Sequence, residues 1–342
     1  MKRILISAAE PSGDVLASEL VTAIRQLGQA EFIGLTGPRM RNVGVESIAK
    51  METISAMGVA EVIGHLPAIH KAKRALINLI NHGIDAAIFI DAPDLHLPLA
   101  KRARKSGAIS IGYVSPQIWA WRASRVKTIT SSFDQLLCLF EFEPKLYGDF
   151  DARWVGHPVV DRQRYRQAVD QDLFGLTPGS RRQETDRMLG PFIRAAEHVR
   201  SIRPTARFTL VSPVTPLRVP SWIEHTKRIE DLNRARAVLT KSGTITLELA
   251  VMGVPQVVAH RVHPVTHWLG RKLVQGIEHI AMPNILSQSA VVPEYIQDLN
   301  PMELATALLK LPEHQAIDLR PLGEPGAIQR AANAVWTKLE AA

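Results

Sequence analysis

Short apolar runs alternate with longer amphipathic stretches through the first half of the chain. An apolar run that stops at Gly, Pro or Ser is typical of a buried strand, and apolar residues that recur every three or four positions predict a helix. These patterns predict strands over residues 3–8, 32–36, 88–90, 109–114 and 135–140, and helices over 15–27 and 66–81. Because strands that alternate with helices build parallel sheets, residues 1–160 are predicted to form one doubly wound α/β domain.

The pattern begins again after the charge-dense segment 161–172. Further strands are predicted over 173–176, 208–211, 238–240 and 256–259, with one helix over 184–202 and another that ends at 252. We therefore expect a second Rossmann-like domain over 161–321 and a C-terminal helix, about 322–342, that packs back on the first domain. Two such parallel sheets are expected to hold a ligand in the cleft between their facing strand edges.

The composition changes this picture little. An apolar fraction of 46% and a charged fraction of 22% in 342 residues indicate a globular protein. The N-terminus lacks a signal-peptide pattern and no stretch approaches the ~20 apolar residues of a spanning helix, so a cytoplasmic protein is expected. The single Cys138 lies in an apolar run and is expected to be a core thiol, which excludes a cysteine-based metal site.

The net charge of +8 indicates an anionic partner, which could be a phosphorylated small molecule, an acidic membrane surface or nucleic acid. The basic residues are scattered and no nucleic-acid-binding motif is present, so binding to nucleic acid is not expected. A non-enzymatic nucleic-acid-binding protein is nevertheless the alternative that charge alone suggests.

Two acids follow the most continuous apolar strand. Asp91 and Asp94 come directly after residues 88–90. Ligands of open parallel sheets bind outside the carboxyl ends of the strands, so acids placed there are candidates for chemistry. The alternative is a solvated acid that caps the next helix, and from the strand alone the two interpretations are balanced.

The second domain offers two candidate phosphate sites. Ser242, Gly243 and Thr244 stand between a strand and a helix, where exposed backbone N–H groups stabilise an anion, and Glu248 follows one turn later, in reach of ribose hydroxyls. Ser180 and Arg181 stand at a similar turn, where a guanidinium suits bidentate phosphate contact. An ordinary N-cap and solvated arginines are the alternatives.

Two further segments are apolar and close to basic residues. They contain Met57, Val59 and Val62 in the first and Trp119 and Arg122 in the second. Packing between elements is the default interpretation, and contact with acyl chains or an anionic membrane is the alternative. Among the histidines, His157 is expected to be structural, and no metal-ligand spacing is found, so no metal or other cofactor is expected.

Taken in order along the chain, these segments resemble the lipid-A-disaccharide synthase family. The motifs that carry the resemblance are Glu10 with Ser12-Gly13-Asp14, Gly37-Pro38-Arg39-Met40, Met57-Gly58-Val59 with Glu61-Val62, Asp91-Ala92-Pro93-Asp94, Tyr113-Val114-Ser115-Pro116, Trp119-Ala120-Trp121-Arg122, Gly156-His157, Pro178-Gly179-Ser180-Arg181, Ser242-Gly243-Thr244 with Glu248, and Pro283-Asn284. Any one of them is weak, but the ordered set is specific.

The resemblance implies a GT-B glycosyltransferase with two Rossmann-like domains, bound peripherally to the anionic inner-membrane surface, with a homodimer as an option. Its expected substrates are UDP-2,3-diacylglucosamine and 2,3-diacylglucosamine 1-phosphate (lipid X), joined as a β-1,6 disaccharide with release of UDP. Asp91 matches the family's proposed general base. Glu10 and Asn284 match positions that the family needs for activity or binding, Glu10 as a second catalytic candidate and Asn284 on the donor side. The other residues that match the nucleotide side are Ser180, Arg181, Ser242, Gly243, Thr244 and Glu248.

The chain departs from the family in length. It is shorter than usual, mainly around residues 161–172 and 214–236, which leaves uridine specificity less secure than phosphate binding. Two alternatives therefore stay open within this architecture: a related glycosyltransferase with another sugar nucleotide or glycolipid acceptor, and a UDP-sugar 2-epimerase-like enzyme.

Overall fold

The computed structural model describes residues 1–54, 62–118, 125–162, 166–262 and 279–341. The chain divides into two compact units. The first consists of Met1–Asp161 and Arg320–Ala342, and the second of Arg162–Leu319.

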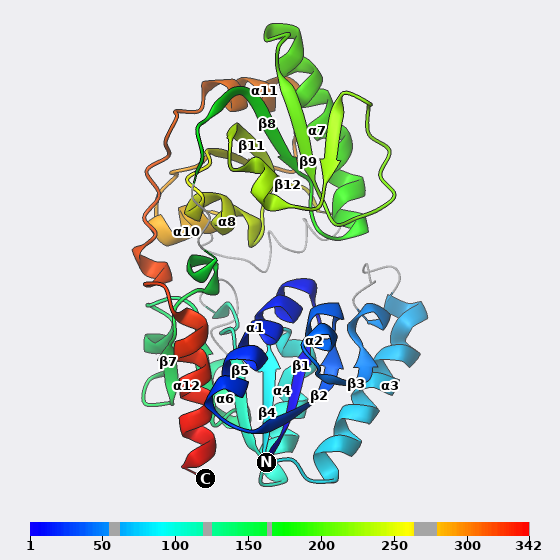
Figure 1. Cartoon of the computed structure of the whole chain (residues 1–342), viewed down its shortest axis with the longest axis vertical. Coiled ribbons are helices and arrows are strands. Elements are labelled where there is room, and N and C mark those ends of the chain that lie inside the picture. Colours follow the sequence, from blue (N-terminus) through cyan, green and yellow to red (C-terminus); the bar gives the residue numbers. More distant parts are fainter. Residues whose placement is uncertain (55–61, 119–124, 163–165, 263–278, 342) are drawn as a thin grey trace. The chain divides into compact units, whose positions relative to one another are not determined.

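The described residues of the first unit form a seven-stranded sheet in the order β3-β2-β1-β4-β5-β6-β7, and all pairs are parallel (Figure 1). The strands are β1 (Lys2–Ala8), β2 (Ala30–Thr36), β3 (Glu46–Lys50), β4 (Ala86–Ile90), β5 (Ile109–Tyr113), β6 (Gln135–Cys138) and β7 (Ala152–Trp154). The order reverses between β1 and β4, so this pair is the topological switch point of the sheet.

Helices cover both faces of this sheet. The helices are α1 (Pro11–Leu27), α2 (Pro38–Asn42), α3 (Val62–Asn81), α4 (Pro93–Lys105), α6 (Val126–Ser132) and α12 (Ala327–Glu340), with 3-10 turns η1 (Met51–Thr53), η3 (Pro144–Tyr147), η4 (Pro158–Asp161) and η6 (Arg320–Leu322). Leu5 and Phe89 form one core cluster with residues of α3 and α4. Alternate strand residues face the other side, where α1 and α12 pack on each other.

The chain returns to the first unit through a capped helix. The carboxylate of Asp161 accepts hydrogen bonds from the backbone N–H groups of Gly326, Ala327 and Ile328 at 2.7, 3.0 and 2.8 Å, at the start of α12. A carboxylate at a helix N-terminus satisfies orphan donors and is favoured by the helix dipole. This contact fixes the last helix of the chain on the first unit.

The described residues of the second unit form a six-stranded parallel sheet in the order β10-β9-β8-β11-β12-β13. The strands are β8 (Asp170–Thr177), β9 (Arg207–Val211), β10 (Ile223–Thr226), β11 (Ala235–Lys241), β12 (Gln256–His260) and β13 (Glu294–Ile296). The helices are α7 (Arg182–Ile202), α8 (Ile245–Val251), α10 (Met282–Ser287) and α11 (Pro301–Lys310), with the 3-10 turn η5 (Ile229–Leu232). Here the order reverses between β8 and β11.

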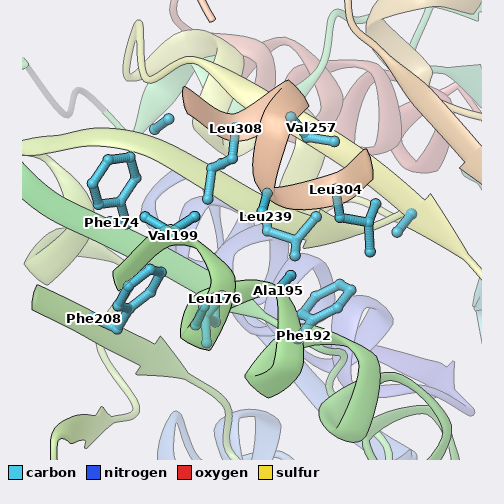
Figure 2. Packing of buried hydrophobic residues seen from close by; sticks show 14 of the residues in the cluster. Phe174, Leu176, Phe192, Ala195, Val199, Phe208, Leu239, Val257, Leu304 and Leu308 are labelled. Carbon is cyan, nitrogen blue, oxygen red and sulfur yellow. The ribbon is translucent and has the colours of Figure 1, made fainter. Parts of the chain in front are cut away.

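Figure 2 shows the larger core of this unit, in which side chains of α7 and α11 pack on one face of the sheet. Phe192 of α7 and Leu304 of α11 are fully buried against Leu239 and Val257 of the central strands. Residue Val238, one position from Leu239, belongs to a separate cluster with Leu249 of α8 on the opposite face. The sheet is therefore covered on both sides, as the near-continuous apolar strands predict.

Several strands differ from the sequence-based expectation. The short edge strands β7, β10 and β13 were not predicted, and β3 and β8 show why. Strand β3 was not predicted because it has no buried residue, as an edge strand with one neighbour does not require a continuous apolar run. Strand β8 begins at Asp170, three residues before the predicted start, because Asp170 and Asp172 pair with Arg207 and Arg203. Charged residues that carry ion pairs extend this strand beyond its apolar part.

Candidate functional site

The first candidate site lies at the switch point of the first sheet. Ala8, the last residue of β1, pairs with Ile90, the last residue of β4. Glu10 follows the first of these strands by two residues and Asp91 follows the second directly. The topology therefore brings these two acids to the same sheet edge, at the position where open α/β sheets bind ligands.

The backbone at this edge is strained. Asp91, Ala92 and Val114 have positive φ angles of 50°, 48° and 77°. The left-handed conformation costs an L-residue about 1–2 kcal/mol, and a β-branched residue such as Val is a genuine outlier there. Strained residues of this kind cluster at functional sites. The Asp91 turn thus combines two consecutive left-handed residues with an acidic side chain at this edge.

A buried histidine that was not among the predicted site residues contacts this turn. His96 of α4 is completely buried, and its Nδ1 lies 2.7 Å from the backbone carbonyl oxygen of Asp91. Its Nε2 lies 2.9 Å from the hydroxyl oxygen of Ser7 in β1. The sequence signals were a histidine one turn into the helix after Asp91 and a serine inside an apolar strand, but neither shows that the two residues meet.

Other residues of the family-like motifs have structural roles. Asp14 is buried in the first turn of α1, and its carboxylate accepts hydrogen bonds from the N–H groups of Arg39 and Met40 at 2.9 and 3.0 Å. Asp94 is exposed and forms an ion pair with Arg125 at 2.7 Å. The Nδ1 of His157 accepts a hydrogen bond from a backbone N–H, that of Val159, at 3.1 Å, which agrees with a structural histidine.

The second candidate site lies at the switch point of the second sheet. Thr177 at the end of β8 pairs with Thr240 near the end of β11, and their hydroxyl groups lie 2.5 Å apart. The turn after β8 requires Gly179, whose φ is 130° and where an added Cβ would lie 2.8 Å from the Cβ of Glu184. The backbone at this turn therefore approaches α7 more closely than any side chain would allow.

Two cations share one carboxylate at this turn. The Nζ of Lys241 lies 3.1 Å from Glu184 Oε1, and Nη1 of Arg181 lies 3.8 Å from the same oxygen. The Arg181 side chain is 41% exposed and can reach a ligand, whereas that of Lys241 is 15% exposed. Lys241 was not among the predicted site residues, although a charged residue directly after an apolar strand marks the sheet edge. Two cations and one carboxylate leave a net positive charge at this edge, which suits a phosphate ligand.

The segment Ser242-Gly243-Thr244 differs in part from its predicted role. The Ser242 N–H donates to the carbonyl of Ala259 at 3.1 Å, and its hydroxyl donates to the carbonyl of Ile280 at 2.7 Å. Ser242 is therefore committed as a donor to the protein. Any phosphate contact at this segment rests on the amides of Gly243 and Thr244, and an added Cβ at Gly243 would meet no described atom within 4 Å.

Glu248 and Asn284 are both engaged within the second unit. Glu248 Oε1 lies 3.4 Å from Nη1 of Arg162. Asn284 is completely buried, and its side chain hydrogen bonds to Val292 and to Glu294, each at 2.8 Å. Glu294 in turn accepts the N–H of Ile280, the residue whose carbonyl holds Ser242. Asn284 is thus connected to Ser242 at the sheet edge through Glu294 and Ile280, without contacting that edge directly.

The predicted lipid-facing residues are only partly covered by the structure. Met57, Val59, Trp119 and Arg122 lie outside the described residues, and Val62 is the first residue of α3. Within the described ranges, no helix is both long and apolar enough to cross a membrane. The described part of the chain also contains no group of three or more His, Cys, Asp or Glu side chains that could hold a metal ion.

Solved structures define the class of this fold. The chain superposes on spinosyn forosaminyltransferase with a TM-score of 0.65 at 13% identity, covering 99% of each chain. It superposes equally well on UDP-GlcNAc 2-epimerase from Neisseria meningitidis, solved with UDP-GlcNAc, with a TM-score of 0.64 at 12% identity over 98% of this chain and 100% of that one. At these identities the likeness concerns the fold alone, and the two parallel sheets make this a GT-B-like protein.

Sequence comparison then gives the family. The family model for lipid-A-disaccharide synthetase matches residues 4–316. The lipid-A-disaccharide synthase of Sulfurihydrogenibium sp. is 31% identical and is covered over 99% of both chains. The chain belongs to the lipid-A-disaccharide synthase family and is a glycosyltransferase of lipid A biosynthesis. That alignment spans 391 positions against the 342 residues of this chain, so the relative carries segments that this chain lacks.

Proposed function

We propose that this protein transfers 2,3-diacylglucosamine from its UDP donor to the 6-hydroxyl of lipid X, giving the β-1,6 disaccharide and UDP. The observation that carries the proposal is the family match, which runs through both units over residues 4–316. The acids at one switch point and the cations at the other provide the chemistry that this reaction needs.

In the proposed mechanism Asp91 is the general base. It takes the proton of the acceptor 6-hydroxyl as the oxygen attacks the anomeric carbon of the donor, and the bond from that carbon to the phosphate oxygen breaks. Attack opposite the leaving group inverts the configuration. Glu10, at the same sheet edge, is proposed to bind the acceptor beside Asp91.

The second unit is proposed to hold the nucleotide and to stabilise departing UDP. Arg181 and Lys241 supply positive charge, and the turn at Ser180 together with the amides of Gly243 and Thr244 supplies donors. Because these groups can offset the developing charge, the proposed reaction is independent of metal. Glu248 is assigned to the ribose.

Asn284 is assigned an indirect role in donor binding. Its bonds to Val292 and Glu294 fix the segment whose carbonyl, at Ile280, orients Ser242. The donor side therefore depends on Asn284 through the backbone that it holds.

A peripheral position on the anionic inner membrane, on its cytoplasmic side, is proposed from the net charge of +8 and from the acylated substrates. Met57, Val59, Val62, Trp119 and Arg122 are the proposed contacts to lipid. The replacement of Val62 and Ile63 by Ser is expected to reduce flotation with vesicles that contain phosphatidylglycerol. Unchanged flotation together with a lower melting temperature would assign these residues to the core instead. Sedimentation equilibrium of the purified protein without vesicles would test the homodimer that the resemblance leaves as an option.

The function is tested by incubating the purified protein with UDP-2,3-diacylglucosamine and lipid X in the presence of EDTA. The expected product is the disaccharide mass together with UDP, formed only when both substrates are present, with β configuration in the proton NMR spectrum. A 2-epimerase would change the UDP-sugar without consuming lipid X. A transferase with another acceptor would leave lipid X unchanged, and either result would contradict the proposal.

A further inference from the structure

The turn that carries Asp91 is held by contacts from three separate elements. The Asp91 N–H donates to the carbonyl of Tyr113 in β5 at 3.0 Å, and the Asp91 carbonyl lies 2.7 Å from Nδ1 of His96 in α4. The other ring nitrogen of His96 lies 2.9 Å from the hydroxyl oxygen of Ser7 in β1. Both peptide groups of a strained residue are therefore tied to neighbouring strands, one of them through a histidine.

The chemistry of the partners fixes the direction of these hydrogen bonds. A carbonyl oxygen only accepts, so Nδ1 of His96 must carry the proton. Burial lowers the pKa of His96 to about 4, so the ring is neutral at physiological pH and Nε2 is an acceptor. Ser7 must then donate to Nε2. The result is a hydrogen-bond relay in which Ser7 donates to His96 and His96 donates to the Asp91 carbonyl.

This hydrogen-bond relay ends at Asp91, the proposed base, whose position relative to the acceptor determines the rate. Asp91 and Ala92 have φ angles of 50° and 48°, a conformation that costs an L-residue about 1–2 kcal/mol and that surrounding contacts must offset. The turn has no cap from a side chain, since Ala92 is the N-cap residue of α4. A misplacement of about 1 Å at a reacting group can reduce the rate by about 100-fold.

We propose that His96, supported by Ser7, is a positioning residue that holds the Asp91 backbone in the left-handed conformation from which its carboxylate acts on the acceptor. The inference rests on the proposed function of Asp91 as the base. It assigns to His96 no contact with substrate and no transfer of a proton in the reaction.

Two amide substitutions separate the two bonds of His96. In His96→Asn the side-chain nitrogen occupies the δ position, so it can donate to the Asp91 carbonyl but cannot reach Ser7. In His96→Gln the amide lies at the ε position, near Ser7 and away from Asp91. We expect kcat to fall less than about fivefold in His96→Asn and about 10–100-fold in His96→Gln, with unchanged affinity for UDP in both.

Ser7→Ala tests the same hydrogen-bond relay with a variant that keeps the shape of the strand. It should lower kcat about threefold to tenfold, because His96 loses the donor that fixes its ring. Ser132→Ala is the matched control, since Ser132 is a buried serine of the same unit whose hydroxyl donates locally to the Thr128 carbonyl, one turn earlier, at 2.7 Å. Rates are expressed per folded protein, determined from near-UV circular dichroism.

The outcomes distinguish this inference from the proposed function. If Asp91→Asn keeps wild-type turnover, the assignment of the base is wrong and the role of His96 falls with it. If Asp91→Asn is inactive but His96→Gln and Ser7→Ala turn over like the wild type, only the positioning role is wrong. Equal losses in His96→Asn and His96→Gln would also contradict it. Should His96→Gln not fold, Ser7→Ala decides, and the wild-type kcat in that variant overturns the inference.

Discussion

The switch-point edges of the two sheets hold their functional groups by different means. In the first unit the turn after β4 places non-glycine residues, Asp91 and Ala92, in the left-handed region and ties them down through His96. In the second unit the turn after β8 contains Gly179 at a φ of 130°, and the groups proposed to bind phosphate are the long side chains of Arg181 at this turn and of Lys241 at the end of β11.

The difference matches the chemistry proposed for each edge. A general base acts only at one place and direction, so a fixed backbone is an advantage. A diphosphate presents several oxygens to any nearby cation. Its binding site therefore depends more on the local positive charge than on the exact orientation of one side chain. Variants at the first edge should therefore change turnover, and variants at the second should change affinity for UDP.

The largest effect is expected at Asp91. Asp91→Asn keeps the shape of the side chain but removes the base, and kcat for disaccharide formation should fall about 10²–10⁴-fold. Asp94→Asn is the matched control, because Asp94 lies on the same turn but is exposed and paired with Arg125, and it should remain within about twofold of the wild type. Turnover of Asp91→Asn close to that of the wild type would remove the base from this edge.

Arg181 should have the next largest effect, on binding. Arg181→Ala is expected to weaken UDP binding about 10–100-fold in calorimetry, because hydrogen bonds to charged groups contribute roughly 1.5–3 kcal/mol. The neighbouring Arg182 pairs with Asp186 instead, so Arg182→Ala should bind UDP like the wild type. Equal losses in both variants would indicate a general charge effect without a specific site.

Lys241 should contribute less than Arg181, because its side chain is 15% exposed and already bonded to Glu184. We expect Lys241→Met to weaken UDP binding about threefold to tenfold and Lys241→Arg to restore most of it, since the charge is what this position supplies. Unchanged affinity in Lys241→Met, measured at low ionic strength, would show that Lys241 only supports the turn.

A smaller effect, on the pH dependence of stability, is expected from the fully buried His96 of the first unit and the partly buried His260 of the second. Burial lowers the pKa of His96 to about 4, and burial with nearby Lys241 does the same for His260 at the end of β12. The unfolded value is near 6.5, so the neutral ring favours folding above pH 6.5 and this contribution is lost as the pH falls from 6.5 toward 4.

When the pH is lowered from 7.5 to 5.0, protonation of each histidine in the unfolded state should lower the free energy of unfolding by about 2 kcal/mol. The difference between wild type and His96→Asn, or wild type and His260→Asn, should therefore shrink at pH 5.0 in urea titrations. The same difference at both pH values would mean that the ring titrates normally in the folded protein.

The sequence predicted the strands that are apolar throughout, and it predicted the candidate site residues that directly follow these strands. Strand β4 is buried at every position, so its sequence is a continuous apolar run and the charged Asp91 marks its end. The sequence could not show which residues of distant elements meet, because a periodic pattern reports only on its own element. Ser7 and His96, for example, are in contact although they lie 89 positions apart. In the same way the donors of Ser242 are occupied by Ala259 and Ile280, which no local pattern indicates.

The most direct test of this division is a calorimetric titration of UDP into Asp91→Asn beside Arg181→Ala and the wild type. Asp91→Asn should bind UDP with the wild-type dissociation constant although it has lost turnover, while Arg181→Ala binds at least about tenfold more weakly. If Asp91→Asn loses as much affinity for UDP as Arg181→Ala, the two edges do not have separate roles and the proposed assignment of base and nucleotide sites is wrong.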